Sequence, residues 1–324
     1  MKKKKKKIRL KKQAYYLLAV IVFLVVGVIL GINFYNDFKY KQTNEYKLTS
    51  KGYSLEDTNV LLDKLSENSI SSLINQDKND TLVGLVKEKY FLEKNLDRYL
   101  AYIEEEEEED NLTDVVAIVN VNADHKWYEE ELETDTSLNE QMIVNKFYAL
   151  SVDYTPENLV SIPLDYSYGT EGENQLIEYA YDKFLDLWQA AHDEGFYLMV
   201  TSSYRDYASQ KEIYDYRKAT QGERKADETA ARPGHSEHQT GLVVDMTSTT
   251  EPSATDFSES EAYKWLKEHA HEFGFIERYP EGKTYLTGYS PESWHWRYVG
   301  IEAATVMHEE NITYDEYYAF YLTK

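Results

Sequence analysis

Three side chains from two distant segments could together hold a catalytic zinc ion. The segment GHSEHQTGLVVD provides His238 and Asp245, and the segment PESWHWRYVG provides His295. Imidazole nitrogens and carboxylate oxygens both suit catalytic zinc, which typically takes three protein ligands and leaves a fourth position for water. Two histidines and one aspartate leave the ion with net positive charge, so it can lower the pKa of its water and polarise a carbonyl group. These residues therefore predict a metal centre that activates water.

Two further sets of residues supply other groups that hydrolysis of an amide needs. The reaction requires a base for the attacking water and an acid for the leaving amine, and Glu292, three residues before His295, suits both roles in turn. The alternative for Glu292 is a cap on the turn that follows Pro291. The segment SSYRDYASQ adds Arg205 and Gln210. The alternatives there are a surface ion pair for the arginine and a solvent-facing position for the glutamine.

Three motifs in the sequence resemble those of the VanY-type zinc D-alanyl-D-alanine carboxypeptidases, whose fold is shared by bacterial peptidoglycan metallopeptidases and hedgehog signalling domains. The pattern S-x-H-x-x-G-x-x-x-D is matched by Ser236, His238, Gly241 and Asp245. The pattern E-x-W-H is matched by Glu292, Trp294 and His295. The pattern S-x-Y-R, with glutamine five residues on, is matched by Ser202, Tyr204, Arg205 and Gln210. The resemblance covers roughly residues 115–324, and Val244 departs from it where alanine is expected.

The resemblance implies a role for each matched residue. One Zn2+ would be bound by His238, Asp245 and His295. Glu292 would be the general base and then the acid. Arg205 would grip the free C-terminal carboxylate of the substrate through two parallel hydrogen bonds, which favours carboxypeptidase over endopeptidase activity. Gln210 and Ser236 would hold the peptide backbone, and Trp294 would form a wall of the pocket.

The implied activity is a D,D-carboxypeptidase that removes the terminal D-alanine from peptidoglycan stem peptides. The same motifs serve L,D-carboxypeptidases that act on tetrapeptide stems, and also D,D-dipeptidases that act on free D-Ala-D-Ala. An alternative of another class is a non-catalytic wall-binding module of the same fold. Such a module would lack a metal ligand or the base, and neither is missing from this sequence.

These side chains must be positioned by a mixed set of strands and helices. The run LVVDM predicts a buried strand, and His238 lies seven residues before Asp245, so the chain must turn between them at Gly241. FYLMVTSS and WHWRYVG predict two more strands, the second with His295 and Arg297 on one face. We also expect strands at 115–122 and 142–150, a helix at 174–192, a mobile loop at 220–233, and a helix capped by Ser258. This order predicts an α+β fold with a mainly antiparallel sheet flanked by helices.

The amino-terminal third predicts a membrane anchor and a small helical module. Nine basic residues lie in the first twelve positions, and the 19 residues of 14–32 carry no charge. A membrane-spanning helix needs about 20 apolar residues, and the basic flank places the N-terminus in the cytoplasm. A cleaved signal peptide is the alternative, but no A-x-A-like site follows. We expect four parts: a basic cytoplasmic tip (1–13), a transmembrane signal-anchor (14–33), a linker and helical module (34–113), and the zinc carboxypeptidase domain (114–324). Within the third part we expect one helix from Ser54, a second helix over 80–102, and a solvated linker at Glu104–Asp110.

Composition restricts the partners. The chain has no cysteine, so disulfides and thiolate ligands are excluded. Its formal net charge is −23 despite the basic tip, and a strongly acidic body argues against nucleic acid as a partner. The apolar segment and the family resemblance imply two partners, the cytoplasmic membrane and peptidoglycan stem peptides, with the catalytic domain outside the cell on the wall side of the membrane.

Overall fold

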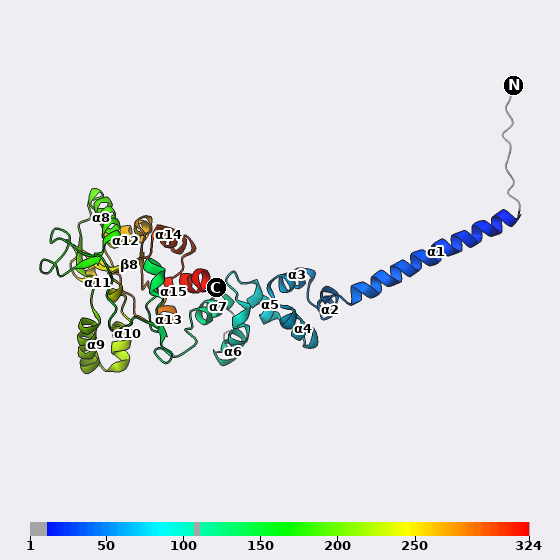
Figure 1. Ribbon diagram of the computed structural model, residues 1–324, viewed down its shortest axis with the longest axis horizontal. Coiled ribbons are helices and arrows are strands. Elements are labelled where there is room, and N and C mark those ends of the chain that lie inside the picture. The colour runs from blue at the N-terminus through cyan, green and yellow to red at the C-terminus, as the bar shows by residue number, and fades with distance from the viewer. Residues whose placement is uncertain (1–11, 107–110, 324) are drawn as a thin grey trace, which may run out of the picture. The chain divides into compact units, whose positions relative to one another are not determined.

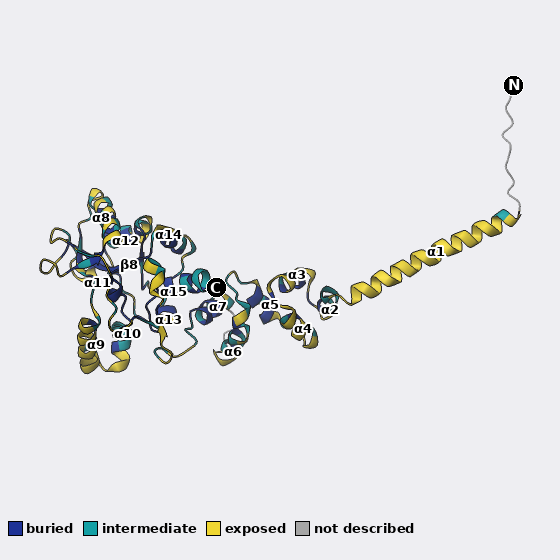
Figure 2. Ribbon diagram, viewed as in Figure 1, coloured by how far each residue is buried: buried dark blue, intermediate teal, exposed yellow. Residues whose placement is uncertain are grey.

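The computed structural model describes residues 12–106 and 111–323, which divide into two compact units, Met1–Lys94 and Asn95–Lys324 (Figure 1). Most of the predicted basic tip and the end of the acidic run lie outside the described residues. The first unit begins with α1 (Lys12–Lys41), a 30-residue helix with no buried residue (Figure 2). The predicted transmembrane segment lies within this helix, which is long and apolar enough to cross a membrane.

Four short helices follow α1 in the first unit: α2 (Asn44–Ser50), α3 (Leu55–Lys64), α4 (Glu67–Asn75) and α5 (Asp80–Lys87). Their core includes the fully buried Leu48, Leu61 and Leu85. The cap predicted at Ser54 is present, since its hydroxyl accepts a hydrogen bond from a backbone amide of α3. The single helix predicted over 80–102 is wrong, because α5 ends at Lys87. Lys64 donates to the carbonyl of Val86, in the last turn of α5, and to that of Glu88, just beyond it.

The second unit is built on a four-stranded antiparallel sheet. Its strands are β5 (Leu198–Ser202), β6 (Val243–Ser248), β7 (Phe275–Glu277) and β8 (His295–Tyr298), in the order β5-β6-β8-β7. The three strands expected at FYLMVTSS, LVVDM and WHWRYVG are confirmed, and so is the α+β fold with a mainly antiparallel sheet. Two small sheets accompany it: β1 (Leu132–Glu133) with β2 (Tyr148–Ala149), and β3 (Leu159–Ser161) with β4 (Gln175–Ile177).

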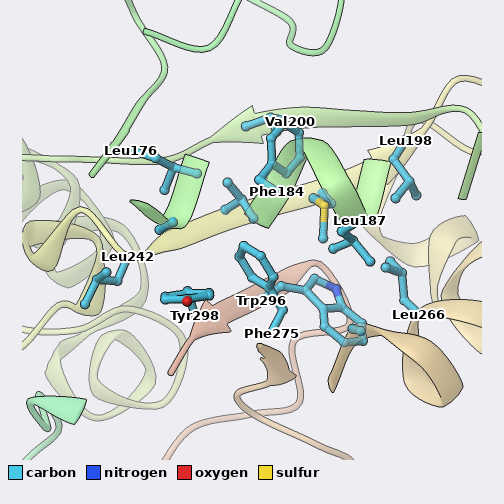
Figure 3. Close-up of a cluster of buried hydrophobic side chains, with 14 of the residues drawn as sticks. Leu176, Phe184, Leu187, Leu198, Val200, Leu242, Leu266, Phe275, Trp296 and Tyr298 are labelled. Atoms are coloured by element: carbon cyan, nitrogen blue, oxygen red, sulfur yellow. The ribbon is translucent and has the colours of Figure 1, made fainter. Parts of the chain in front are cut away.

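Helices pack on this sheet and bury its apolar face. Phe184 and Leu187 of α8 (Glu178–Asp193) share one core with Val200 of β5 and Trp296 of β8 (Figure 3). Each of these side chains is at most 1% exposed, and full burial of one large apolar side chain is worth about 1.5–3 kcal/mol. The helical and 3-10 segments of the second unit not given elsewhere are η1 (Glu93–Asn95, which spans the boundary), α6 (Leu96–Glu106), η2 (Thr136–Gln141), α11 (Ala254–Phe257), α12 (Glu261–His269), η4 (Ala270–Phe273), α13 (Thr284–Thr287), α14 (Ile301–Glu310), α15 (Tyr314–Tyr317) and the π-helical η5 (Tyr318–Leu322).

One of the expected strands is wrong, and another is much shorter than predicted. Residues 115–122 lie mostly in α7 (Leu112–Asn120), which Asn111 caps by accepting from the amide of Asp114. Within 142–150 only Tyr148–Ala149 pairs as a strand. The side chain of Asn145 accepts from the two amides that precede and begin this strand, so a side-chain turn interrupts the run.

The predicted mobile loop and one predicted cap also need correction. Residues 220–233 contain the end of α9 (Tyr207–Gln221) and all of α10 (Glu223–Thr229). Asp227 fixes this region, because its carboxylate accepts two hydrogen bonds from Arg232 and one from Tyr214. The helix α12 is capped by Ser260, whose hydroxyl accepts from the amide of Tyr263, and not by Ser258.

Candidate active site

The strand register sets two of the predicted metal ligands side by side. Asp245 of β6 is paired directly with His295 of β8, and on its other side it is paired with Ser202 at the end of β5. Directly opposed residues of an antiparallel pair have Cβ atoms about 4.5–5.5 Å apart. The pairing of β6 with β8 therefore places two residues that are 50 positions apart in the sequence directly beside each other.

The third predicted ligand comes from the short helix before β6. His238 lies in η3 (Glu237–Thr240), and Gly241 ends it in the left-handed conformation (φ 68°), as the odd spacing predicts. The Nδ1 atom of His238 lies 2.6 Å from the carbonyl oxygen of Ser203, so Nδ1 carries the proton and Nε2 is left with a free lone pair. That Nε2 lies 3.5 Å from Oδ2 of Asp245.

These three side chains fit a zinc ion. One possible ligand atom from each lies within 4.8 Å of the other two, and all three residues are buried. His295 Nδ1 lies 3.3 Å from Asp245 Oδ1, but without hydrogen-bond geometry, so Oδ1 has no hydrogen-bond partner among the described residues. A buried carboxylate oxygen without a partner is costly, and a cation bound there would remove the cost.

The two imidazoles lie in opposite electrostatic environments. Burial lowers the pKa of His238 to about 3, so this imidazole is neutral and able to bind a metal at ordinary pH. Burial also lowers the pKa of His295, but the carboxylates of Asp245, Glu237 and Glu292 outweigh it and raise that pKa to about 9. The site thus attracts a positive charge, which either a proton or a metal ion can supply.

Glu292 lies at the edge of the cluster without being a member of it. Its Oε2 is 3.5 Å from Nδ1 of His295, and its side chain keeps 18% of its surface exposed. Burial raises the pKa of Glu292 to about 7; Asp245 adds to this rise, while His295 and the two arginines Arg205 and Arg217 oppose it. A carboxyl group with a near-neutral pKa can both accept and donate a proton, which is what a general base that later becomes the acid must do.

Arg205 is held in place by two side-chain hydrogen bonds and forms no ion pair with a described carboxylate. Its Nη1 donates to Oε1 of Gln210 and its Nη2 donates to Oγ of Ser202, each at 2.8 Å. Its backbone amide also donates to the carbonyl of His238, which ties the arginine loop to the metal cluster. No described carboxylate lies within 4.0 Å of the guanidinium group, so an anionic ligand can bind it without displacing an internal partner.

One cavity of about 650 Å3 joins all eight predicted site residues. They are the three ligands His238, Asp245 and His295 together with Glu292, Arg205, Gln210, Ser236 and Trp294. Gln210 is only 2% exposed, and its amide already bonds to Arg205 and to the carbonyl of Ala231. This geometry makes Gln210 a support for the arginine, while its contact with the peptide backbone and those of Ser236 and Trp294 stay predictions.

Sequence reasoning missed Glu237 as part of the site. Its Oε2 lies 3.3 Å from Nε2 of His295, on the side of that ring away from Asp245. Arg278 donates to Oε1 at 2.8 Å, and Nη1 of Arg297 lies 3.4 Å from it. Burial alone would raise the pKa of Glu237, but the two arginine charges outweigh it and hold that pKa well below its usual range.

Glu237 therefore orients His295 as a permanently ionised partner, a type of contact that commonly fixes metal-binding histidines. The sequence contained one sign of this contact, because His295 and Arg297 were expected to lie on the same face of the strand in WHWRYVG. A buried arginine beside a metal ligand requires a carboxylate, and Glu237, next to His238 in the first motif, is the carboxylate that supplies it.

Comparison with known proteins bears on the same residues. The family model for D-alanyl-D-alanine carboxypeptidase, VanY, matches residues 173–301. The protein YodJ of Bacillus subtilis (strain 168) is 40% identical over 183 residues, which are 54% of this chain and 66% of YodJ. A D-alanyl-D-alanine carboxypeptidase of Enterococcus faecalis (strain ATCC 700802 / V583) is 42% identical over 141 residues, which are 41% of this chain and 51% of that protein.

A solved structure extends the match over nearly a whole relative. The structure of the LdcB LD-carboxypeptidase, described as revealing the molecular basis of peptidoglycan recognition, is 36% identical with a TM-score of 0.56. The match covers 60% of this chain and 92% of LdcB, whereas the chain spans only about half to two thirds of the two relatives above. Because the matched family region contains every residue that builds the cavity's metal cluster, the chain belongs to the VanY family of D-alanyl-D-alanine carboxypeptidases.

Proposed function

We propose that this chain is a membrane-anchored zinc D,D-carboxypeptidase that removes the C-terminal D-alanine from peptidoglycan stem peptides outside the cell. One observation carries the proposal. A single cavity contains an arginine with no ion-pair partner among the described residues, a carboxyl group with a pKa near 7, and a buried His-Asp-His cluster. These are the groups that recognise a free C-terminus, transfer a proton and hold a metal.

Arg205 selects the end of the peptide. Its guanidinium group is positioned by Gln210 and Ser202, which leaves the remaining N–H groups to grip a carboxylate. Paired hydrogen bonds between a guanidinium group and a carboxylate are strong and directional. A peptide held in this way presents its last peptide bond to the cluster, so one residue is released at each turnover.

Glu292 moves the proton. When bound by His238, Asp245 and His295, zinc supplies a Lewis acid that polarises the scissile carbonyl and acidifies water. Glu292, ionised above its pKa, accepts a proton from the attacking water and then donates it to the leaving amine nitrogen. During both proton transfers, Glu237 keeps the ring of His295 in position through its contact with Nε2.

A second candidate is L,D-carboxypeptidase activity on tetrapeptide stems. The observation that favours it is the similarity to LdcB, whose structure is described as that of an LD-carboxypeptidase and which this chain covers over 92% of its length. In both reactions the same residues would bind the metal, transfer the proton and bind the terminal carboxylate. The two candidates differ only in the residue that precedes the scissile bond, so a direct comparison of substrates separates them.

The experiment uses the full-length chain in detergent, loaded with zinc. It is incubated with stem peptides of five residues ending in D-Ala-D-Ala and with tetrapeptide stems ending in one D-alanine. Mass spectrometry then identifies which stem loses one residue. Loss of one residue from the pentapeptide supports the proposed activity, loss from the tetrapeptide supports the second candidate, and cleavage of neither contradicts both.

Two variants check the roles of the residues. Glu292→Gln keeps the shape of the side chain but removes the base, so we expect kcat to fall by about 10²–10⁴-fold with zinc content unchanged. Arg205→Gln should lower kcat/KM for free peptides, with zinc content again unchanged, and should bring free and C-terminally amidated peptides to similar rates. Equal turnover by Glu292→Gln and the parent would exclude the catalytic role, and a retained preference for free C-termini in Arg205→Gln would exclude the carboxylate grip.

A further inference from the structure

The helix α9 forms one wall of the catalytic cavity with a regularly spaced face. Gln210, Ile213, Arg217 and Gln221 all line the cavity. They are three, four and four residues apart, so they lie along one side of the helix. Gln210, at the beginning of this face, holds Arg205, and Arg217 lies two turns further along the same wall.

Among the described residues, Arg217 forms no ion pair, and its charge acts only at longer range on Glu292 of the same cavity. The other two basic residues of α9 are both paired, Lys211 with Asp215 and Lys218 with Glu223. Arg217 is partly buried, and among the described residues no carboxylate lies within 4.0 Å of it. Glu212 also lines the cavity but makes no ion pair with Arg217. In a chain with a net charge of −23, an unpaired arginine facing a cavity requires an explanation.

The spacing along α9 between Gln210, which holds Arg205, and Arg217 corresponds to a short length of peptide. Arg217 follows Gln210 by seven residues, and a helix rises 1.5 Å per residue, which gives about 10 Å along the wall. An extended peptide advances about 3.3 Å per residue, so the same distance spans about three residues. A peptide whose C-terminal carboxylate is held by Arg205 would therefore bring the residue three positions before its last one to the level of Arg217.

We propose that Arg217 binds a second carboxylate of the substrate, carried about three residues before the C-terminal residue. This inference rests on the proposed function, because it takes the peptide's C-terminus to lie at Arg205. The enzyme then recognises an acidic peptide at two anionic points, the free C-terminus and an upstream carboxylate. Neutralisation of that upstream group, for example as a carboxamide, weakens recognition without touching the scissile bond.

The test compares N-acetylated pentapeptides that end in lysine, D-alanine and D-alanine. One has glutamate at its second position and the other has glutamine there, so they differ by one negative charge and not in shape. With the full-length zinc protein we expect kcat/KM to be about tenfold higher for the glutamate peptide. Arg217→Gln should bring the ratio of the two kcat/KM values close to one. Lys218→Gln, the same change one residue on but outside the cavity, should leave the ratio at its parental value.

Each outcome decides between the proposals. A ratio near one in the parent, or a parental ratio in Arg217→Gln, overturns the inference and leaves the proposed function intact. If the parent cleaves neither peptide, the proposed function fails, and calorimetry on the same zinc-loaded protein then tests Arg217 alone. A tenfold lower Kd for the glutamate peptide, lost in Arg217→Gln, supports the second carboxylate site. Equal Kd values, or no binding of either peptide, reject it.

Discussion

At the scale of single residues, the acid-base behaviour of Glu292 follows from its surroundings. A carboxyl group in water has a pKa near 4.5, and burial beside Asp245 raises that of Glu292 to about 7. A divalent cation bound nearby opposes this rise, so the pKa in the metal-loaded protein should lie between these two values. The general base must be ionised, so activity is present above this pKa and is lost as the pH falls through it.

We therefore predict an acid limb in the pH profile of kcat/KM with an inflection between pH 4.5 and about 7. Glu292→Gln should remove this limb together with most of the rate. Metal content measured across the same pH range separates protonation of Glu292 from loss of zinc. A profile that stays flat down to pH 4.5 in zinc-loaded protein would show that another group is the base.

At the scale of elements, the turn from η3 into β6 sets the distance between two ligands. Gly241 has a φ of 68°, and a Cβ atom added there would lie 3.0 Å from both Leu159 and Pro156. A substitution therefore meets two costs, left-handed backbone strain of about 1–2 kcal/mol and displacement of packed side chains. Gly195 has a similar φ of 90° but open space around it, so it isolates the first cost.

We predict that Gly241→Ala lowers the free energy of unfolding by about 1–3 kcal/mol more than Gly195→Ala does. Tryptophan fluorescence during urea unfolding is a suitable measurement, because all five tryptophans lie in the second unit. Gly241→Ala should also weaken zinc binding, since the turn carries His238 toward Asp245. Equal losses of stability in the two variants would mean that the contacts around Gly241 relax without cost.

The elements also show how far sequence reasoning could reach. The strands β5, β6 and β8 could be predicted because each has a run of β-branched or alternating residues. The same rule failed for α7, whose β-branched run follows a capping asparagine at Asn111 and buries Val115, Val116 and Val119 at helical spacing. The cluster of candidate metal ligands could be predicted from motif and chemistry, but the partner of His295 could not. Glu237 acquires its role only when Arg278 and Arg297, from two other strands or their ends, meet it in the folded chain.

At the scale of the whole molecule, an acidic catalytic unit follows a basic, apolar amino terminus. The charge of the catalytic unit repels anionic surfaces, so electrostatics alone cannot keep the enzyme near a wall or lipid head groups. The helix α1, with its exposed apolar residues and mean hydropathy of 2.9 over its best window, could do so by crossing the bilayer. Anchoring raises the local concentration of enzyme beside a polymeric substrate, which a soluble enzyme would lose by diffusion.

We predict that the full-length chain stays in the membrane fraction after alkaline carbonate extraction. Protease added outside intact spheroplasts should digest the second unit and leave the amino terminus protected. The double variant Val25→Arg and Val26→Arg places two charges in the middle of α1, at about 2.5–3.5 kcal/mol each, and should release the protein or block its export. The matched change at Tyr35 and Asn36, near the end of the helix, should be tolerated. A soluble parent whose mass lacks the first 30 or so residues would instead identify a cleaved signal peptide, because an intact span cannot be lost without cleavage.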